Sequence, residues 1–159
     1  MKDAVLAALA DYAAGKTGAT RAIAGAIASH FLAVTTARSL ALVGGDVSVQ
    51  SLLAHRTWFD PKDIRCTSGS VAAAVGGRQV PLAEALAADI VCVHEPIAIT
   101  GVQLRRGTHI NALAAVTLDS ELRSVATLVD EAGLHKLAAG IIDGRQLDEL
   151  TVFVYGAVP

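Results

Sequence analysis

Aromatic residues are scarce in this chain of 159 residues: Phe, Trp and Tyr make up 4% of it, although hydrophobic residues make up 53%. The core is therefore expected to consist of Ala, Val, Leu and Ile. Such small side chains suit helices packed closely on a parallel sheet that is covered on both faces. The length fits one domain, which is large enough to bury about two-thirds of the surface of the unfolded chain.

Long apolar runs and an excess of basic residues are also missing. Polar residues or glycine interrupt each apolar run within about a dozen residues, which is too short to span a bilayer. The N-terminus lacks a basic region followed by an apolar segment, so no signal peptide is expected. Thirteen basic and fifteen acidic residues give a net charge of −2 and form no basic stripe, which argues against nucleic acid as a partner.

Cysteine is rare, with only Cys66 and Cys92 in the chain. Each falls inside a predicted strand. We expect buried, free thiols in a cytoplasmic protein, since disulfides are uncommon in reducing compartments. The alternative, a disulfide, requires that the two strands are neighbours with suitable geometry.

Apolar strand-like segments alternate with helical ones along the chain. The spacing predicts Ala-rich helices over 3–14 and about 19–32, strands over 39–44, 63–67, 89–94, 108–113, 124–128 and 150–155, and further helices at about 47–56, 81–87 and 131–139. This alternation favours right-handed β-α-β crossovers. We predict one Rossmann-like α/β domain over 1–159, a mostly parallel sheet with helices on both faces. Residues 1–35 form its N-terminal helices and residues 39–159 its α/β core.

The first predicted strand runs into the turn Gly44-Gly45-Asp46 and then a helix. In the dinucleotide fingerprint G-x-G-x-x-G, the second glycine lets the pyrophosphate approach the backbone, and the third allows close packing of helix and strand. Here Asp46 and Val49 occupy these positions. A carboxylate beside a phosphate costs on the order of 1 kcal/mol or more. We expect Asp46 to cap the helix with its own charge and so to oppose dinucleotide binding.

The end of the second predicted strand bears on the choice of cofactor. An acidic residue that binds the ribose is expected about 20 residues after the fingerprint, but the chain reads Arg65-Cys66-Thr67-Ser68 there. Thr67, Ser68 and Arg65 tolerate a 2′-phosphate, so NADP is favoured over NAD if either binds, although neither cofactor is predicted outright. The candidate cofactor-binding residues are Gly44, Gly45, Asp46, Thr67, Ser68 and Thr17.

His94 and Glu95 follow the third predicted strand, at the edge where α/β proteins bind ligands. A His–Glu pair serves acid–base chemistry or orients a metal ligand, but neighbours on an extended chain point to opposite faces. No two histidines have the i, i+4 spacing of a helical metal site, so no metal is predicted.

Gly15-Lys16-Thr17 suggests a phosphate-binding loop. That pattern needs a glycine where the chain has Ala10, and a strand instead of a helix before it, so this interpretation fails. Thr17 is expected to cap the second helix. Lys16 beside that helix start remains a candidate anion-binding residue.

Residues 104–112, Leu-Arg-Arg-Gly-Thr-His-Ile-Asn-Ala, resemble the L-x-P-G-T-H-I-N-A segment of the ornithine cyclodeaminase/μ-crystallin family. Five more segments resemble the family in the same order: 15–19 (R-T-G-A), 39–44 (first nucleotide-domain strand), 88–91 (A-D-I-V), 137–143 (L-x-x-G-x-I-D) and 148–153 (D-E-I-T-V-F). The resemblance implies a Rossmann domain that binds NAD(P) and a substrate domain, built largely from the N-terminal half, that carries the dimer interface. Such enzymes cyclise ornithine, reduce cyclic ketimines or make N-alkyl amino acids.

The chain departs from this family at residues that carry the chemistry. Lys16 takes the place of the arginine that grips the substrate carboxylate and lacks its planar fork. Val116 takes the place of the catalytic aspartate and cannot accept a proton; Asp119 replaces it only if the loop is rebuilt. The chain begins just before the R-T-G-A-like segment, so most of the substrate domain is expected to be absent.

These departures favour a non-catalytic or ligand-binding module that acts through oligomerisation or a partner. The alternative is an NAD(P)-dependent oxidoreductase or cyclodeaminase-like enzyme for an amino or imino acid. Its site would be completed across an oligomer by Lys16, His94 and Glu95 as catalytic candidates. A homodimer is expected, because the apolar faces of the Ala-rich helices must cover the sheet edge or pair with a second copy.

Overall fold

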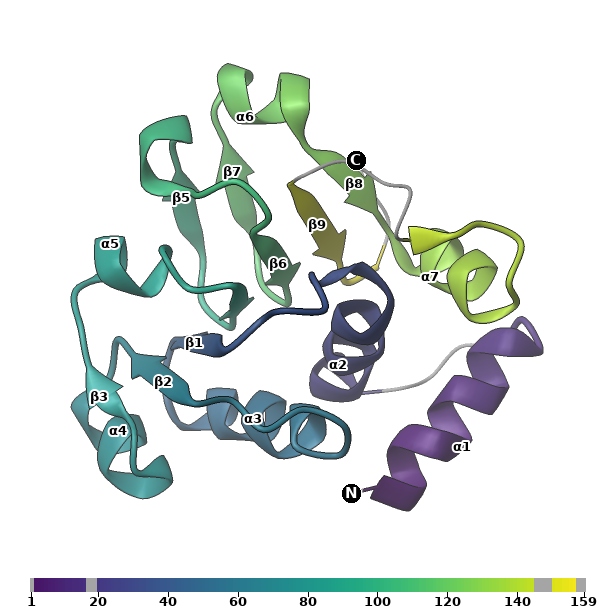
Figure 1. The fold of residues 1–159 in the computed structure, drawn as a ribbon, viewed down its shortest axis with the longest axis horizontal. Helices are drawn as coiled ribbons and strands as arrows, with labels where there is room; N and C mark the ends of the chain where they lie inside the picture. Colours follow the sequence, from purple (N-terminus) through teal and green to yellow (C-terminus); the bar gives the residue numbers. More distant parts are fainter. Residues whose placement is uncertain (1, 17–19, 145–149, 157–159) are drawn as a thin grey trace.

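The computed structural model describes residues 2–16, 20–144 and 150–156 (Figure 1). Within them a parallel sheet runs in the order β3-β2-β1-β4-β6-β9-β8. Its strands are β1 Ser39–Val43, β2 Asp63–Cys66, β3 Arg78–Gln79, β4 Ile90–Val93, β6 His109–Ala112, β8 Thr127–Val129 and β9 Thr151–Val154. A second parallel sheet joins β5 (Ile97–Ile99) to β7 (Val116–Leu118). The predicted Rossmann-like α/β fold is confirmed.

Helices precede or connect these strands. They are α1 Lys2–Ala13, α2 Arg21–Leu32, α3 Val49–His55, α4 Gly69–Val75, α5 Leu82–Ala85, α6 Ser120–Val125 and α7 Glu131–Ala138, with short 3₁₀ segments at Asp46–Ser48 (η1) and Gly101–Gln103 (η2). The two predicted N-terminal helices are confirmed as α1 and α2. Thr20 caps α2, because its hydroxyl accepts the amide of Ile23 at 3.4 Å. Thr17, the predicted cap, lies outside the described residues.

The prediction of a strand over 124–128 is wrong by three residues at its start. The Asp119 carboxylate accepts the amide of Leu122 at 2.9 Å and so starts α6, which continues to Val125. The strand therefore begins only at Thr127, where it pairs with β9. Helix α4 and strands β3, β5 and β7 were not predicted.

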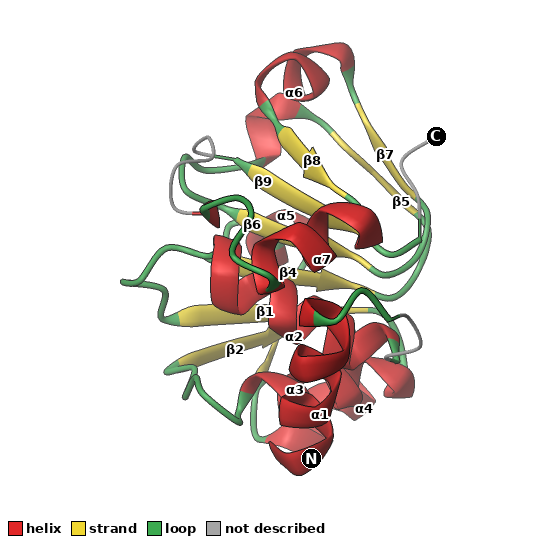
Figure 2. Ribbon diagram, turned by 90° about the vertical axis from the view of Figure 1, so that its right-hand side faces the viewer, coloured by secondary structure: helices red, strands yellow, loops and turns green. Residues whose placement is uncertain are grey.

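The two faces of the main sheet are covered by different helices (Figure 2). Leu40, Leu42 and Cys92 face α3 and α4, while Ala41, Val43 and Val91 on the same strands face the layer that contains α5 and α6. This is the alternation expected of strands, whose successive side chains point to opposite faces. Cys66 on β2 and Cys92 on β4 are both buried and free, and β1 lies between their strands. The two strands are therefore not neighbours, as a disulfide would require.

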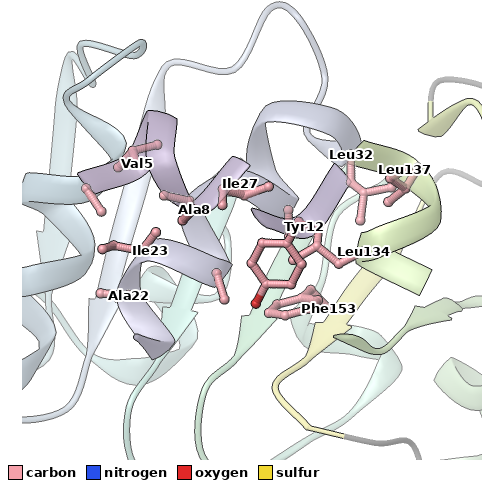
Figure 3. Packing of buried hydrophobic residues seen from close by; sticks show 14 of the residues in the cluster. Val5, Ala8, Tyr12, Ala22, Ile23, Ile27, Leu32, Leu134, Leu137 and Phe153 are labelled. Carbon is pink, nitrogen blue, oxygen red and sulfur yellow. The ribbon is translucent and has the colours of Figure 1, made fainter. Parts of the chain in front are cut away.

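Helix α1 packs on α2 and α7 (Figures 1 and 3). Its residues Val5, Ala8 and Tyr12 are buried in one cluster with Leu134 of α7 and Phe153 of β9. Tyr12 also donates a hydrogen bond to the carboxylate of Glu131 at 3.4 Å. The apolar side of α1 is thus covered by helices of the same chain rather than applied to the sheet edge.

Candidate functional site

The strand order reverses between β1 and β4. From β1 the chain proceeds outward to β2 and β3, and it then returns to β4 and continues in the other direction through β6. The last residues of the two strands, Val43 and Val93, are direct partners. In open α/β sheets, a crevice that binds ligands forms outside the carboxyl ends of the strands at such a switch point. Gly44 and His94 follow these two strands and lie against each other.

Gly44 has a φ of +134°, a conformation that side chains other than glycine rarely adopt. A Cβ atom built on it would lie 3.1 Å from the Cβ of His94. Its amide donates to Oγ1 of Thr67 at 3.2 Å, which ties the turn after β1 to the end of β2. Gly45, in contrast, borders open space. The backbone conformation therefore requires glycine at position 44, the first glycine of the fingerprint. It does not require glycine at position 45.

Asp46 does not cap the helix, so that prediction is wrong. Asp46 is itself the first residue of η1, and the capping position before it is held by Gly45, which has no side chain to offer. The Asp46 carboxylate instead accepts a hydrogen bond from Ser70 in the first turn of α4, at 3.4 Å. Among the described residues, the backbone amides of Gly45, Asp46 and Val47 have no hydrogen-bond partner. Three consecutive donors therefore remain unpaired in the turn after β1, at the switch point.

A cavity of about 500 Å³ lies at the ends of β2 and β3. Its lining residues are Thr67, Gln79, Val80, Pro81, Leu82 and Glu95. Ser68 caps α4 through the amide of Val71 and is hydrogen-bonded to Ser70 at 3.0 Å. Arg65 does not line the cavity: its guanidinium binds Asp63 at 2.8 Å and the backbone carbonyl of Glu84 at 2.9 Å. Of the predicted 2′-phosphate residues, only Thr67 lines this cavity.

His94 and Glu95 lie at the predicted edge in different surroundings. Nε2 of His94 lies 2.7 Å from the hydroxyl of Ser51, a buried residue of α3. Burial, together with the charge of Arg21, lowers the pKa of His94 to about 4, so the ring is neutral at pH 7. Glu95 is exposed and faces the cavity beside Thr67. His94 thus faces Ser51 of α3, whereas Glu95 faces the cavity.

A buried chain of hydrogen bonds lies behind His94, on the side of the sheet that faces α2 and α3. Asn111 on β6 joins His109, at 2.8 Å, to Ser29 of α2, also at 2.8 Å. Ser29 in turn lies 2.8 Å from His55 of α3, whose other ring nitrogen lies 2.7 Å from the carbonyl of Ser51. Burial lowers the pKa of both His55 and His109 to about 4. This chain joins α2, α3 and β6 with neutral groups.

A second cavity, of about 400 Å³, lies at the ends of β6 and β9. Arg21, at the start of α2, donates to the carbonyl of Leu113 at 2.7 Å and lies over the ring of Tyr155, 5.3 Å from its centroid. Arg123 also lines the cavity, whose other walls are mainly apolar strand ends and the loop after β6. Sequence reasoning missed both arginines, because their place in the site depends on tertiary contacts. The only signal for Arg21 was its position two residues beyond the 15–19 segment.

The positions that departed from the family pattern fall in different places. Val116 lines the second cavity from β7. Asp119 does not replace the missing acid: its two oxygens accept the amides of Leu122 and Gly101, at 2.9 and 3.0 Å, and these bonds hold its pKa below the usual range. Lys16 is exposed and lines neither cavity. No three His, Cys, Asp or Glu residues within the described ranges are grouped to hold a metal ion.

Several solved structures have the same fold. An archaeal alanine dehydrogenase dimer with bound NAD matches with a TM-score of 0.76 and 20% identity, over 87% of this chain and 58% of that one. The iminosuccinate reductase of Paracoccus denitrificans, in complex with NAD+, matches with a TM-score of 0.73 and 20% identity, over 87% and 57%. A probable ornithine cyclodeaminase from Bordetella pertussis Tohama I matches with a TM-score of 0.69 and 20% identity, over 86% and 59%. The chain shares the fold of these proteins.

The structural neighbours agree with the resemblance found in the sequence, since ornithine and lysine cyclodeaminases are among them. The chain spans 57–59% of the length of the three neighbours described above. At 20% identity the likeness establishes the fold and no activity. No protein-family model matches the sequence, and no curated protein does. None of the described helices is long and apolar enough to cross a membrane.

Proposed function

We propose that this chain binds a nicotinamide dinucleotide and serves an NAD(P)-dependent oxidoreductase or cyclodeaminase-like enzyme that acts on an amino or imino acid. The observation that carries the proposal is the run of unpaired amides after β1 at the switch point, together with one cavity at the ends of β2 and β3 and another at the ends of β6 and β9. Solved neighbours that contain NAD or NAD+ share this fold and add support.

The residues present fit such a cofactor. The amides of Gly45, Asp46 and Val47 form a run of donors suited to a pyrophosphate. The cavity beside Thr67 and Glu95 has room for the adenosine half, and the cavity beside Arg21 and Ala112 for the nicotinamide and a small substrate. The nicotinamide supplies the transfer of a hydride when it is bound.

The chain's own groups support an anionic substrate in the second cavity. Arg21 is held in place by the Leu113 carbonyl and by the Tyr155 ring, and Arg123 contributes a second positive charge. Guanidinium groups suit carboxylates because their donors form a planar fork. The walls beside them are mainly apolar, which suits the hydrocarbon part of a small amino or imino acid.

The second candidate function is a non-catalytic, ligand-binding module, the reading favoured by the sequence. Val116 favours it, because this residue lines the second cavity and carries no group that exchanges a proton. The carboxylate of Asp119 is occupied as the cap of α6. Both candidate functions require the same cofactor site. They differ in whether the bound cofactor reacts with a substrate.

Titration of the purified protein with NADH and NADPH, followed by nicotinamide fluorescence and by calorimetry, tests the shared site. We expect saturable binding of at least one cofactor at micromolar concentrations. Absence of saturable binding of both at millimolar cofactor contradicts the proposal. Protein that binds is then mixed with cyclic ketimines, or with 2-oxo acids and ammonia, and consumption of NAD(P)H is recorded. Binding without consumption favours the module, and consumption favours the enzyme.

A homodimer and a cytoplasmic location stay predictions. One neighbour is described as a dimer, which supports association. Because α1 already buries its apolar side on α2 and α7, a second copy would have to use other surfaces, such as the one around exposed Leu6. Sedimentation equilibrium over a range of protein concentrations measures the mass directly, and a monomer throughout would contradict the dimer.

A further inference from the structure

We propose that the carboxylate of Asp46 selects NAD against NADP, and that it takes the place of the ribose-binding acid missing from the end of β2. This inference rests on the proposed function, namely that a nicotinamide dinucleotide binds in the crevice. It reverses the preference for NADP expected from Thr67, Ser68 and Arg65. The reason lies in where the structure directs the side chains around the ends of β1 and β2.

Asp46 belongs to the turn after β1, but its carboxylate is directed to the region after β2. The two strands are paired, with Leu42 opposite Cys66, and the Gly44 amide binds the Thr67 hydroxyl at 3.2 Å. From this turn Asp46 reaches Ser70, 3.4 Å away. A carboxylate thus lies beside residues 67–70, where dinucleotide-binding domains usually place the acid that accepts the ribose 2′-hydroxyl.

The serines in this region are already occupied by internal hydrogen bonds. Ser68 accepts the amide of Val71 and is bonded to Ser70, while Ser70 donates to Asp46. The two hydroxyls therefore form a chain that ends on a carboxylate. Their arrangement supports the negative charge of Asp46 and leaves little donor capacity for a 2′-phosphate.

The charges around the first cavity favour the same choice. Glu95 lines the cavity together with Thr67 and adds a second carboxylate. The arginines of β2 and β3 are held by other partners: Arg65 by Asp63 at 2.8 Å, and Arg78 by Asp63 at 3.1 Å and Glu84 at 3.2 Å. A 2′-phosphate carries up to two negative charges and would meet carboxylates, while the arginines of β2 and β3 are already committed to other partners. A ribose hydroxyl, in contrast, donates to Asp46 without such repulsion.

The experiment compares the dissociation constants of NADH and NADPH for the same protein at constant, low ionic strength. We expect NADH to bind at least about tenfold more tightly than NADPH. Repulsion between one carboxylate and a phosphate at contact distance is large enough to produce such a difference. In Asp46→Asn the amide oxygen still accepts from Ser70, so the fold is kept while the charge is removed. This variant should lower the ratio of the NADPH dissociation constant to the NADH dissociation constant about fivefold or more, mainly because NADPH binds more tightly.

The matched control is Asp60→Asn, which removes the same charge from an exposed carboxylate before β2, at the opposite edge of the sheet. It should leave the ratio unchanged. Competition by 2′-phosphorylated and unphosphorylated ADP confirms that the effect lies in the adenosine half. The inference is overturned if the parent protein binds NADPH as tightly as NADH, or if Asp46→Asn leaves the ratio unchanged; the proposed function survives either result. If neither dinucleotide binds, the proposed function and this inference fail together.

Discussion

Gly44 places the turn after β1 against His94, and a side chain at this position meets two obstacles. Its φ of +134° is strained for other residues, and a Cβ atom would approach the Cβ of His94 to 3.1 Å. We therefore expect Gly44→Ala to lower the free energy of unfolding by about 1–3 kcal/mol. Gly45→Ala is the matched control on the next residue, where φ is −83° and the space is open. Urea denaturation measures both; equal losses would contradict the backbone argument.

The same turn shows what single residues reveal in a sequence. The turn Gly44-Gly45-Asp46 after β1 was predicted, because a strand followed by Gly-Gly is a strong local pattern. The contact of Asp46 with Ser70 was missed because the helical segment starts one residue earlier than expected, so the aspartate lies inside η1 and not before it. The direction in which a side chain points changes when a helical segment starts one residue earlier or later. Arg21 was missed for a related reason, since its partners, Leu113 and Tyr155, are distant in the chain.

Among the elements, α2 carries Arg21 to the second cavity and depends on its start signal. The hydroxyl of Thr20 accepts the amide of Ile23. Thr20→Ala removes this cap and should cost about 1 kcal/mol of stability. Thr20→Ser keeps the hydroxyl and should stay close to the parent in the same chemical denaturation series. A loss in the serine variant as large as in the alanine variant would show that the cap is unimportant.

Helix α1 contacts the rest of the fold through one buried face. Tyr12 is 1% exposed and packs in the cluster with Phe153, whereas Leu6 on the same helix is 54% exposed. We expect Tyr12→Ala to cost about 3–5 kcal/mol, since it leaves a large cavity, and Leu6→Ala to cost much less. Thermal unfolding of the two variants gives the comparison. Similar losses would mean that α1 packs differently from the arrangement in Figure 3.

The elements differ in how visible they are in the sequence. Strands β1 and β4 are fully buried runs of four or five residues flanked by turns, and they were predicted from that pattern. Strands β3, β5 and β7 contain two or three residues each, too few to show a period, so tertiary pairing defines them. The apolar residues in 120–125 are compatible with a strand or with a helix. The structure has a helix there because Asp119 caps its first turn.

At the scale of the whole molecule, a polar seam crosses an otherwise apolar core. His109, Asn111, Ser29 and His55 are buried between the sheet and helices α2 and α3, and no buried side-chain nitrogen or oxygen in the described part of the chain lacks a hydrogen-bond partner. Such a seam constrains how the helices sit on the sheet, because a shift of one layer would leave several groups unpaired. It also makes the stability of the fold depend on pH.

The sign of that dependence follows from the histidines. Burial lowers the pKa of His55, His94 and His109 to about 4, against 6.5 in the unfolded chain. Below pH 6.5 the unfolded chain therefore takes up protons that the native protein does not bind. The stabilisation is complete above pH 6.5 and is lost as the pH falls towards 4, at up to about 1.4 kcal/mol per pH unit for each histidine. Asp63 and Asp89 have lowered pKa values, so their contribution is lost only at lower pH.

Urea denaturation at half-unit intervals from pH 7.5 to 5 should therefore show a steep loss of stability that starts near pH 6.5. His109→Gln removes one of the three groups, so its curve should fall about a third less steeply, even though the variant is less stable at pH 7. His30→Gln, at an exposed position, should retain the slope of the parent. A flat curve down to pH 5 in the parent would mean that these histidines are not held neutral in the fold. The seam would then be open to water rather than part of the core.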